Sequence, residues 1–567
     1  MLPTLLDHLS SALATVPGSH AYAVDVLRSQ PRRSHALFPH ASNAKTAKVW
    51  HEEVFVVVSE KREAVVSAES AVQTKTGAAG GQVEKDALGG QGSAATGVAS
   101  ASTDVPPVAS ISSAANGSNG TSETSQRTEQ RHVPVAGLEA SLYTIPSTST
   151  SLLYISKVDT SGHSPPSSGP SPTRTLASSF ISYFLLHPPH GSTRVRVHIF
   201  ARAQGQYLFP GSVDNEGKKV LDDKGLIRWW KRTIEKATLE VQAAKQAVQP
   251  PSPLKLFYLV PGLSYLESLP YVPAATLSPS IAWTYSHPYS ALSSPLHAPA
   301  PPIAHPLTDH IPSFPDDPKS RFLHSLTSSS VSSSGTPGDY DDVFLSLASN
   351  AFATGQTPAQ MLADVERGLE RERKRLIEGV PGGVEEWWER MAFRQECCAG
   401  QLVGFFVVAA GEPDLSSVPV SPVAAPPSPT KSASSNSSAT TGAPRPAPLS
   451  LRPTVYTKLW SVLHNFDYSL PALPKLAEAV ERWEEGLEKA LKAEEDGEGE
   501  ETLNEEEWKK RYEREVRREV KVENPLPAVV AGAGEKRAAD GEAGQEADKP
   551  KVNMLAPRKK KKVIPAA

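Results

Sequence analysis

Long tracts without large apolar residues are the feature that most constrains how this chain can fold. The longest tract, residues 68–132, is dominated by Ser, Ala, Gly, Thr and Gln, and a second, residues 413–453, by Ser, Pro and Ala. Such tracts cannot bury enough apolar surface to offset the conformational entropy lost on folding. We therefore expect one large folded core interrupted by disordered segments, and not the several domains that 567 residues alone would suggest.

The remaining segments alternate between strand and helix patterns. Residues 20–28 and 48–58 are rich in Val and aromatic residues, which is typical of strands, and residues 253–263 form an apolar run typical of a strand buried on both faces. Residues 222–248 place Leu, Trp and Ile at helical spacing on one broad face. This alternation predicts a mixed α/β fold, with a single core of a mixed sheet surrounded by helices.

These patterns divide the chain into consecutive segments. They are an N-terminal part of the core at 1–60, a disordered insertion at 68–132, the main core at 134–412, a disordered linker at 413–453, a C-terminal part of the core at 454–485, a charged helix at 486–521 and a disordered tail at 522–567.

Cysteine usage and hydropathy exclude several classes of protein. The two cysteines, Cys397 and Cys398, are adjacent, so they form neither a disulfide framework nor a Cys-x-x-Cys zinc site. Residues 1–16 lack a basic start and indicate an amphipathic helix, not a signal peptide. No apolar run approaches the roughly 20 residues of a membrane helix. We expect a soluble protein of a reducing, intracellular compartment.

Charge is distributed unevenly along the chain although the formal net charge is only -4. Residues 484–507 are strongly acidic, and the C-terminal sequence "PRKKKK" forms a compact basic cluster. The cluster is either a nuclear localisation signal or a solvated charged tail. Its residues are Arg558, Lys559, Lys560, Lys561 and Lys562.

Standard catalytic motifs are missing from the sequence. It contains no phosphate-binding Gly-rich loop, no His-Glu-x-x-His and no Gly-x-Ser-x-Gly. His187 and His190, in "HPPH", could pair on a metal, but histidines in Pro-bound loops are usually not ligands. We therefore expect no metal site.

The stretch "FPDDPKSRFLHSL", from Phe314 to Leu326, begins a helix by the capping rules. Asp317 stands at the N-cap and Pro318 at the first helical position. The cap leaves Asp316 and Lys319 without a role. Two carboxylates would repel a phosphate, so this helix end is suited to attracting or deprotonating a lysine ammonium.

Aromatic and basic residues are dense between 198 and 231. Arg202 and Tyr207 lie where a strand runs into a turn, and Trp229 and Trp230 are adjacent on a helix, pointing about 100° apart. A cationic strand end beside an aromatic wall could hold a phosphate and an acyl group. The same residues also fit an aromatic core with a solvated arginine.

Several segments, taken in order, resemble a known family. They are "LYISKVDTSG", "RVHIFARAQGQYLFPGSVDNEGKKVLDDKGLIRWW", "FYLVPGL", "FPDDPKSRFL", "WWERMAFRQECCAGQLVGFF" and "KLWSVLHNFDYSLP". The chain resembles the fungal histone acetyltransferases that modify lysine 56 of histone H3, a family structurally similar to the CREB-binding-protein acetyltransferases. The resemblance covers roughly 1–60, 134–412 and 454–485, and the insertion, the linker and the acidic stretch past 485 depart from it.

The resemblance implies a mixed α/β acetyltransferase fold that binds acetyl-CoA as co-substrate, without a metal. It assigns the following roles to residues of this chain: Phe200, Ala201 and Arg202 contact the cofactor; Trp229 and Trp230 lie beside the acetyl group and the lysine channel; Tyr207 and Asp159 lie near the active site; Asp316 and Asp317 form an acidic pair, with Asp317 the acid/base; and Lys319 is autoacetylated.

The same resemblance implies the substrate and the partners. A nuclear enzyme would transfer acetyl to histone H3, most readily to lysine 56, on H3–H4 held by chaperones of the anti-silencing and nucleosome-assembly types. The lysine amine would attack the thioester directly, because Cys397 and Cys398 fall in a helix that the resemblance places away from the acetyl site.

Three other interpretations are open. The chain could be a non-enzymatic nuclear histone-binding or scaffold protein, since the acidic residues 484–507 could bind histones by charge; this would be favoured if the acidic pair and Trp229–Trp230 were not near one pocket. Direct nucleic-acid binding is disfavoured because no folded segment shows a sustained basic face. "RAQGQY" matches the pyrophosphate signature of another acetyltransferase superfamily only in part, because Tyr207 replaces its final small residue, and we interpret it as coincidence.

Overall fold

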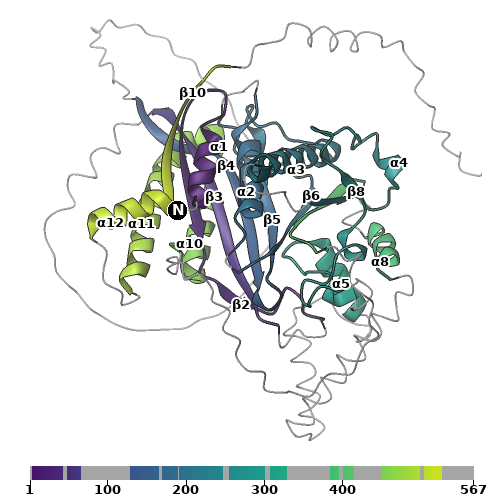
Figure 1. Cartoon of the computed structure of the whole chain (residues 1–567). Coiled ribbons are helices and arrows are strands. Elements are labelled where there is room, and N and C mark those ends of the chain that lie inside the picture. Colours follow the sequence, from purple (N-terminus) through teal and green to yellow (C-terminus); the bar gives the residue numbers. More distant parts are fainter. Residues whose placement is uncertain are drawn as a thin grey trace, which may run out of the picture. The chain divides into compact units, whose positions relative to one another are not determined.

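A ten-stranded mixed sheet runs through the protein in the computed structural model (Figure 1). The structure describes residues 3–41, 47–65, 128–164, 169–189, 191–246, 254–300, 305, 307–328, 383–394, 400–413, 448–497 and 504–526. The strands are β1 (Gly18–Arg28), β2 (Arg32–Ser34), β3 (Val49–Val65), β4 (Thr128–Ile145), β5 (Thr150–Thr160), β6 (Arg194–Arg202), β7 (Lys255–Leu259), β8 (Trp283–Tyr285), β9 (Val403–Ala410) and β10 (Arg517–Asn524).

The sheet order is β10-β1-β3-β4-β5-β6-β9-β7-β8, and β2 pairs with β3. The pairs β5–β6 and β7–β8 are parallel, and the others are antiparallel. The described helices are α1 (Leu5–Leu13), α2 (Pro172–Leu186), α3 (Asp223–Gln246), α4 (Tyr265–Ser268), α5 (Pro318–Ser328), α8 (Gly383–Ala392), α10 (Pro453–His464), α11 (Leu473–Gly497) and α12 (Glu505–Glu515). The predicted mixed α/β core is confirmed.

Helices α1, α2 and α3 cover one face of the sheet (Figure 1). The predicted amphipathic N-terminal helix is α1, which begins with a capping box at Thr4 and buries Leu6 and Leu9. Successive residues of a strand point to opposite faces, so Val54 and Val56 join this core whereas Phe55 points away from it. None of the helices in the described ranges is both long enough and apolar enough to span a bilayer.

The opposite face carries two sets of helices. Helices α10, α11 and α12 pack where β3 crosses it, through Phe55 and Val57. Helices α5 and α8 pack beside β6 and β9 instead, around Phe405. This second set includes the helix whose start the sequence singled out.

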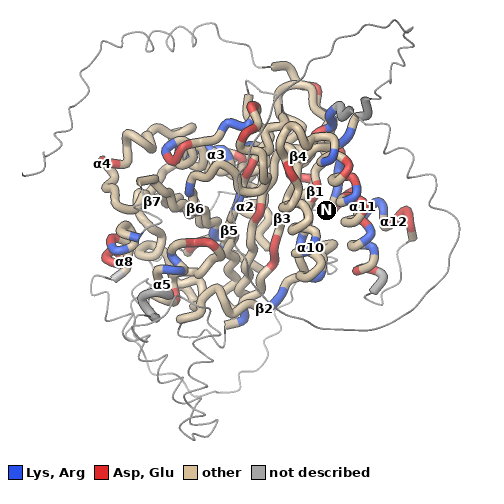
Figure 2. The backbone as a smooth tube through the Cα atoms, turned by 180° about the vertical axis from the view of Figure 1, so that it is seen from behind, with Lys and Arg blue, Asp and Glu red and all other residues tan. Residues whose placement is uncertain are grey.

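The predicted C-terminal boundaries are wrong. The chain from 486 to 521 is not one charged helix: α11 continues unbroken from before 485 to Gly497, α12 follows, and β10 extends to Asn524, inside the predicted tail. Figure 2 shows charged residues along α11 and α12, but α11 also buries Trp483, Leu487 and Leu491 on one stripe. The charged faces are the solvated sides of elements that belong to the core.

The predicted insertion and linker also end too late. Strand β4 begins at Thr128, inside the range 68–132, because β3 continues to Val65 and pairs with it. The end of the range 413–453 is ordered as well: the Leu451 N–H donates to the Arg28 carbonyl over 2.8 Å and its side chain is buried. Backbone pairing needs no apolar sequence, so composition did not reveal these ends. The remainder of both tracts, the localisation cluster, Cys397, Cys398 and His190 lie outside the described residues.

Candidate functional site

The first turn of α5 buries an acid and a lysine against each other. The carboxylate of Asp317 accepts the Lys319 backbone N–H at 2.9 Å with Oδ1, which confirms it as the helix cap, and pairs with the Lys319 ammonium through Oδ2. Asp317 is fully buried and Lys319 is 4 % exposed. Phe405 lies under the ammonium, with its ring centroid 4.5 Å from Nζ.

The neighbouring Asp316 does not join this pair. Its side chain is exposed, and its φ of 58° places the backbone in the left-handed region, which a residue other than Gly rarely adopts. The unusual backbone turns the chain so that Asp317, and not Asp316, enters the protein. The two carboxylates of the sequence motif therefore have different environments.

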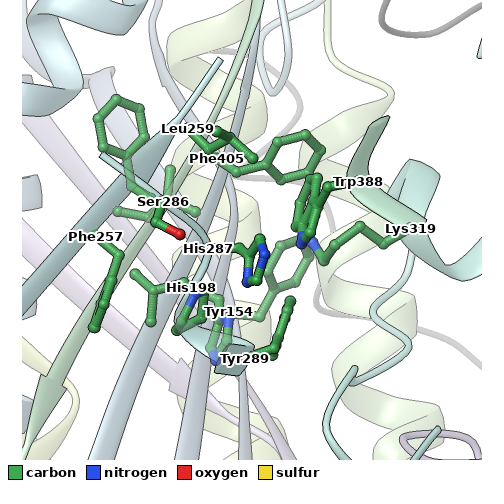
Figure 3. Close-up of a pocket in the computed structure, with 14 residues that line it drawn as sticks. Tyr154, His198, Phe257, Leu259, Ser286, His287, Tyr289, Lys319, Trp388 and Phe405 are labelled. Atoms are coloured by element: carbon green, nitrogen blue, oxygen red, sulfur yellow. The ribbon is translucent and has the colours of Figure 1, made fainter. Parts of the chain in front are cut away.

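A pocket lies beside Lys319 (Figure 3). Its lining includes Tyr154, His198, His287, Tyr289 and Trp388, and the His287 ring stacks on the Trp388 ring at a centroid distance of 5.7 Å. None of these five residues was predicted as a site residue. They come from two strands, one connecting segment and helix α8, and although the resembling segments include Tyr154, His198 and Trp388, nothing in the sequence indicated that these side chains meet.

Burial keeps the two histidines of this pocket neutral at pH 7. It lowers the pKa of His287 to about 4, and burial together with the charges of Lys319 and Arg196 holds the pKa of His198 well below its usual value. Burial and the Asp317 charge raise the pKa of the Tyr289 hydroxyl. Among the described residues, neither His198 Nε2 nor His287 Nδ1 has a hydrogen-bond partner. The pocket is therefore suited to a neutral polar group, such as an amide.

Trp229 and Trp230 lie on the other face of the sheet. Their rings meet edge to face with centroids 4.9 Å apart, and Trp230 packs in the core formed with α1, α2 and α3, which also contains Ala201. They do not line the pocket beside Lys319. Among the described residues, the pocket beside Lys319 therefore does not bring the acidic pair and the Trp pair together.

The two sets of residues nevertheless flank the same strand ends. Phe200 at the end of β6 stacks on Phe405 at the start of β9, with centroids 4.9 Å apart, on the Lys319 side. The preceding residue of β9, Gly404, approaches α3 on the Trp side so closely that an added Cβ would lie 3.1 Å from the Ile227 side chain. A ligand reaching past the ends of β6 and β9 could therefore contact both faces.

Asp159 and Tyr207 form an anchor for the turn that follows β6. Asp159 Oδ2 accepts the backbone N–H groups of Tyr207 at 2.7 Å and Leu208 at 2.9 Å, while Oδ1 pairs with Lys218 Nζ at 2.8 Å. The Tyr207 hydroxyl donates to the carbonyl of Arg202 at 2.5 Å, and burial raises its pKa to about 12. These contacts fix the path of the chain at the exposed Arg202.

Comparison with known proteins gives the class and then the family. A solved structure, the crystal structure of Rtt109 from Aspergillus fumigatus, matches with a TM-score of 0.52 at 22% identity, covering 91% of this chain and 99% of that one, which shows that the fold is shared. The model of the histone acetyltransferase KAT11-type domain matches residues 167–486, more than half of the chain. The chain belongs to the KAT11-type histone acetyltransferase family.

Two curated relatives are similar over part of their length. Histone acetyltransferase rtt109 of Aspergillus flavus is 31% identical over 300 residues, covering 50% of this chain and 45% of the relative. Histone acetyltransferase rtt109 of Schizosaccharomyces pombe is 27% identical over 289 residues, covering 49% and 58%. The chain thus matches about half the length of these relatives, and the family resemblance found in the sequence is confirmed.

Proposed function

We propose that this protein is an acetyl-CoA-dependent lysine acetyltransferase acting on histone H3, with lysine 56 as its main target and chaperone-bound H3–H4 as the form of substrate. The observation that carries the proposal is the buried Asp317–Lys319 pair at the start of α5, beside a pocket for a neutral polar group. Family membership supports the activity. Chaperones of the anti-silencing and nucleosome-assembly types, and nuclear import through Arg558–Lys562, complete the proposal.

The proposed reaction is a direct transfer. The neutral amine of the substrate lysine attacks the thioester carbonyl, the C–S bond breaks, and the thiolate of CoA takes up a proton. Most of the acceleration comes from holding the two reactants together, and Asp317, with Asp316 at the surface, assists removal of the amine proton. The end of β6, Phe200–Arg202, and the Trp229–Trp230 pair are the proposed contacts of acetyl-CoA.

Autoacetylation of Lys319 would change the site around Asp317. The modified side chain is a neutral amide, so the desolvation penalty of a buried ammonium disappears. Its N–H can still donate to the Asp317 carboxylate, and its carbonyl can accept from a pocket histidine such as His198 or His287. Modification also releases Asp317 from its cationic partner and so leaves the carboxylate available to a substrate amine.

The separation of the Trp pair from the acidic pair favours a second candidate function, a histone-binding protein without activity. The positions of the Trp pair and the acidic pair argue against this second candidate, because both pairs lie near the ends of β6 and β9. There Phe200 stacks on Phe405, and Gly404 approaches α3. A bound acetyl group on one side and a substrate lysine on the other would meet there. Activity therefore has to decide between the two candidates.

The experiment incubates the full chain with acetyl-CoA and H3–H4 bound to an anti-silencing chaperone and maps acetylated peptides by mass spectrometry. Asp317→Asn and Trp230→Ala should lose acetylation of lysine 56. The control Asp214→Asn makes the same chemical change at an exposed aspartate and should keep it. Modification of Lys319 in the unaltered chain would support autoacetylation. A folded chain that acetylates nothing in this assay would contradict the acetyltransferase proposal and favour the histone-binding candidate.

A further inference from the structure

Two histidines and an aspartate meet in the connection between β8 and α5, outside the proposed active site. His297 Nε2 lies 2.8 Å from Asp309 Oδ2, and the His297 and His305 rings stack with centroids 3.9 Å apart and 7° between their planes. One nitrogen from each ring and one carboxylate oxygen all lie within 4.8 Å of one another. From the sequence, only His187 and His190 are candidates for a metal pair, and no metal site is expected.

The donor set fits a borderline-soft divalent cation. Imidazole nitrogen and carboxylate oxygen are ordinary ligands of Zn²⁺, and three protein ligands leave the fourth tetrahedral position to water. Two neutral imidazoles and one carboxylate together carry a single negative charge. This charge favours binding of a divalent cation over a single proton shared between His297 and Asp309. Donor atoms around such an ion are about 3.4 Å apart, so the rings need only rotate out of their stack for the three donors to converge.

The surroundings hold the carboxylate in place and leave the histidines accessible. Asp309 is fully buried, its Oδ1 accepts from the Thr308 hydroxyl at 3.3 Å, and its backbone carbonyl accepts from the Ser294 hydroxyl at 2.6 Å. Hydrogen bonds that orient a ligating carboxylate are typical of built metal sites. His297 and His305 are both partly exposed, so an ion can reach them from solvent.

We propose that His297, His305 and Asp309 bind one Zn²⁺ ion. The ion joins His297, His305 and Asp309, and Asp309 lies seven residues before the Asp316 turn. Downstream, the Ser313 N–H donates to the Leu37 carbonyl at 2.7 Å, so the segment before α5 is tied to the N-terminal part of the core. Zinc thereby stabilises the segment that carries Asp317 and Lys319. The proposal does not depend on the acetyltransferase activity.

The test measures zinc directly on the full chain. The protein is stripped with a chelator, dialysed, and titrated with Zn²⁺ against a chromophoric competitor, while atomic emission gives the bound metal. The chain should bind one equivalent, and His305→Ala and Asp309→Asn should each weaken its affinity at least about 10-fold. His35→Ala, which removes an exposed histidine elsewhere, should keep the full equivalent.

Two further readouts keep the test decisive. Co²⁺ in place of Zn²⁺ should give the intense visible absorption of a tetrahedral site, absent in His305→Ala. If Asp309→Asn does not fold because the residue is buried, His305→Ala and His297→Gln decide, with circular dichroism confirming that they are folded. An unaltered chain that takes up no zinc, or variants that bind it as tightly as the unaltered chain, would overturn the proposal.

Discussion

Removing the Asp159 carboxylate should unfold the protein more readily, although the family resemblance connects this residue with activity. The side chains of Asp159 and Lys218 are 4% and 3% exposed, so each charge is almost wholly out of water. Replacing Asp159 with Ala leaves the Lys218 ammonium buried without its partner, and the backbone N–H groups of Tyr207 and Leu208 without their acceptor. Breaking a buried pair from one side costs about 3–5 kcal/mol of unfolding free energy.

The assay is equilibrium unfolding in urea, arranged as a double-mutant cycle. Asp159→Ala should lower the unfolding free energy by about 3–5 kcal/mol. Lys218→Met in the same chain should recover part of that loss because it removes the stranded charge, giving an interaction energy of about 1–3 kcal/mol. Asp214→Ala, at an exposed aspartate, should change the free energy by less than about 0.5 kcal/mol.

The reasoning would be refuted by one combination of results. If Asp159→Ala kept its urea midpoint within the range of the Asp214→Ala control and nevertheless lost acetylation, the carboxylate would act in the reaction. Loss of activity in proportion to loss of folded protein, and its partial return with Lys218→Met, is the outcome that the geometry predicts.

Three other predictions follow from the fold and the site. Burial lowers the pKa of His51 to about 4, so the unfolded state takes up a proton before the folded state does as the pH falls below 6.5. The free energy of unfolding should therefore decrease between pH 6.5 and pH 4, by about 2 kcal/mol at pH 5. His51→Phe, which can still stack on Tyr143, should lose less between pH 7 and pH 5 in paired urea titrations, and an equal loss would contradict this. Lys319→Met should lower the thermal midpoint more than Lys319→Gln, because only Gln keeps a donor for the buried Asp317; equal midpoints would argue against the pair. A chain ending at residue 503 should aggregate in size-exclusion chromatography with light scattering because the β1 edge loses β10, and a folded monomer would disprove that.

Local patterns predicted the elements whose signals are local. The Val-rich runs became β1 and β3, and the apolar run around Phe257 became β7. Asp317 was recognised as a cap because capping depends on the few residues that follow it. Each of these signals is set by neighbours in sequence, so no knowledge of the tertiary fold was needed.

The sequence could not show which face of the sheet each site residue would occupy. Trp230 packs on one face of the sheet and Lys319 on the other. Which face each residue occupies depends on how side chains alternate between the two faces along β6 and β9, and on where α3 and α5 cross these strands. The pocket histidines were missed for the same reason, because His198 and His287 are brought together only by the sheet order. Strand β10 was not predicted because most of its residues are charged or polar, and only Val520 and Val522 are buried.

The pairing of β1 with β10 makes the sheet depend on a strand that is synthesised long after β1. Asp25, on β1, contacts Arg517, 492 residues later in the chain. At about 5–20 residues per second, a ribosome takes roughly 25–100 s to span that distance. Throughout that time one edge of the Val-rich β1 has no partner strand. The nascent chain is therefore expected to require binding by a chaperone. Synthesis of β10, and not of any helix, is expected to determine when the sheet is completed.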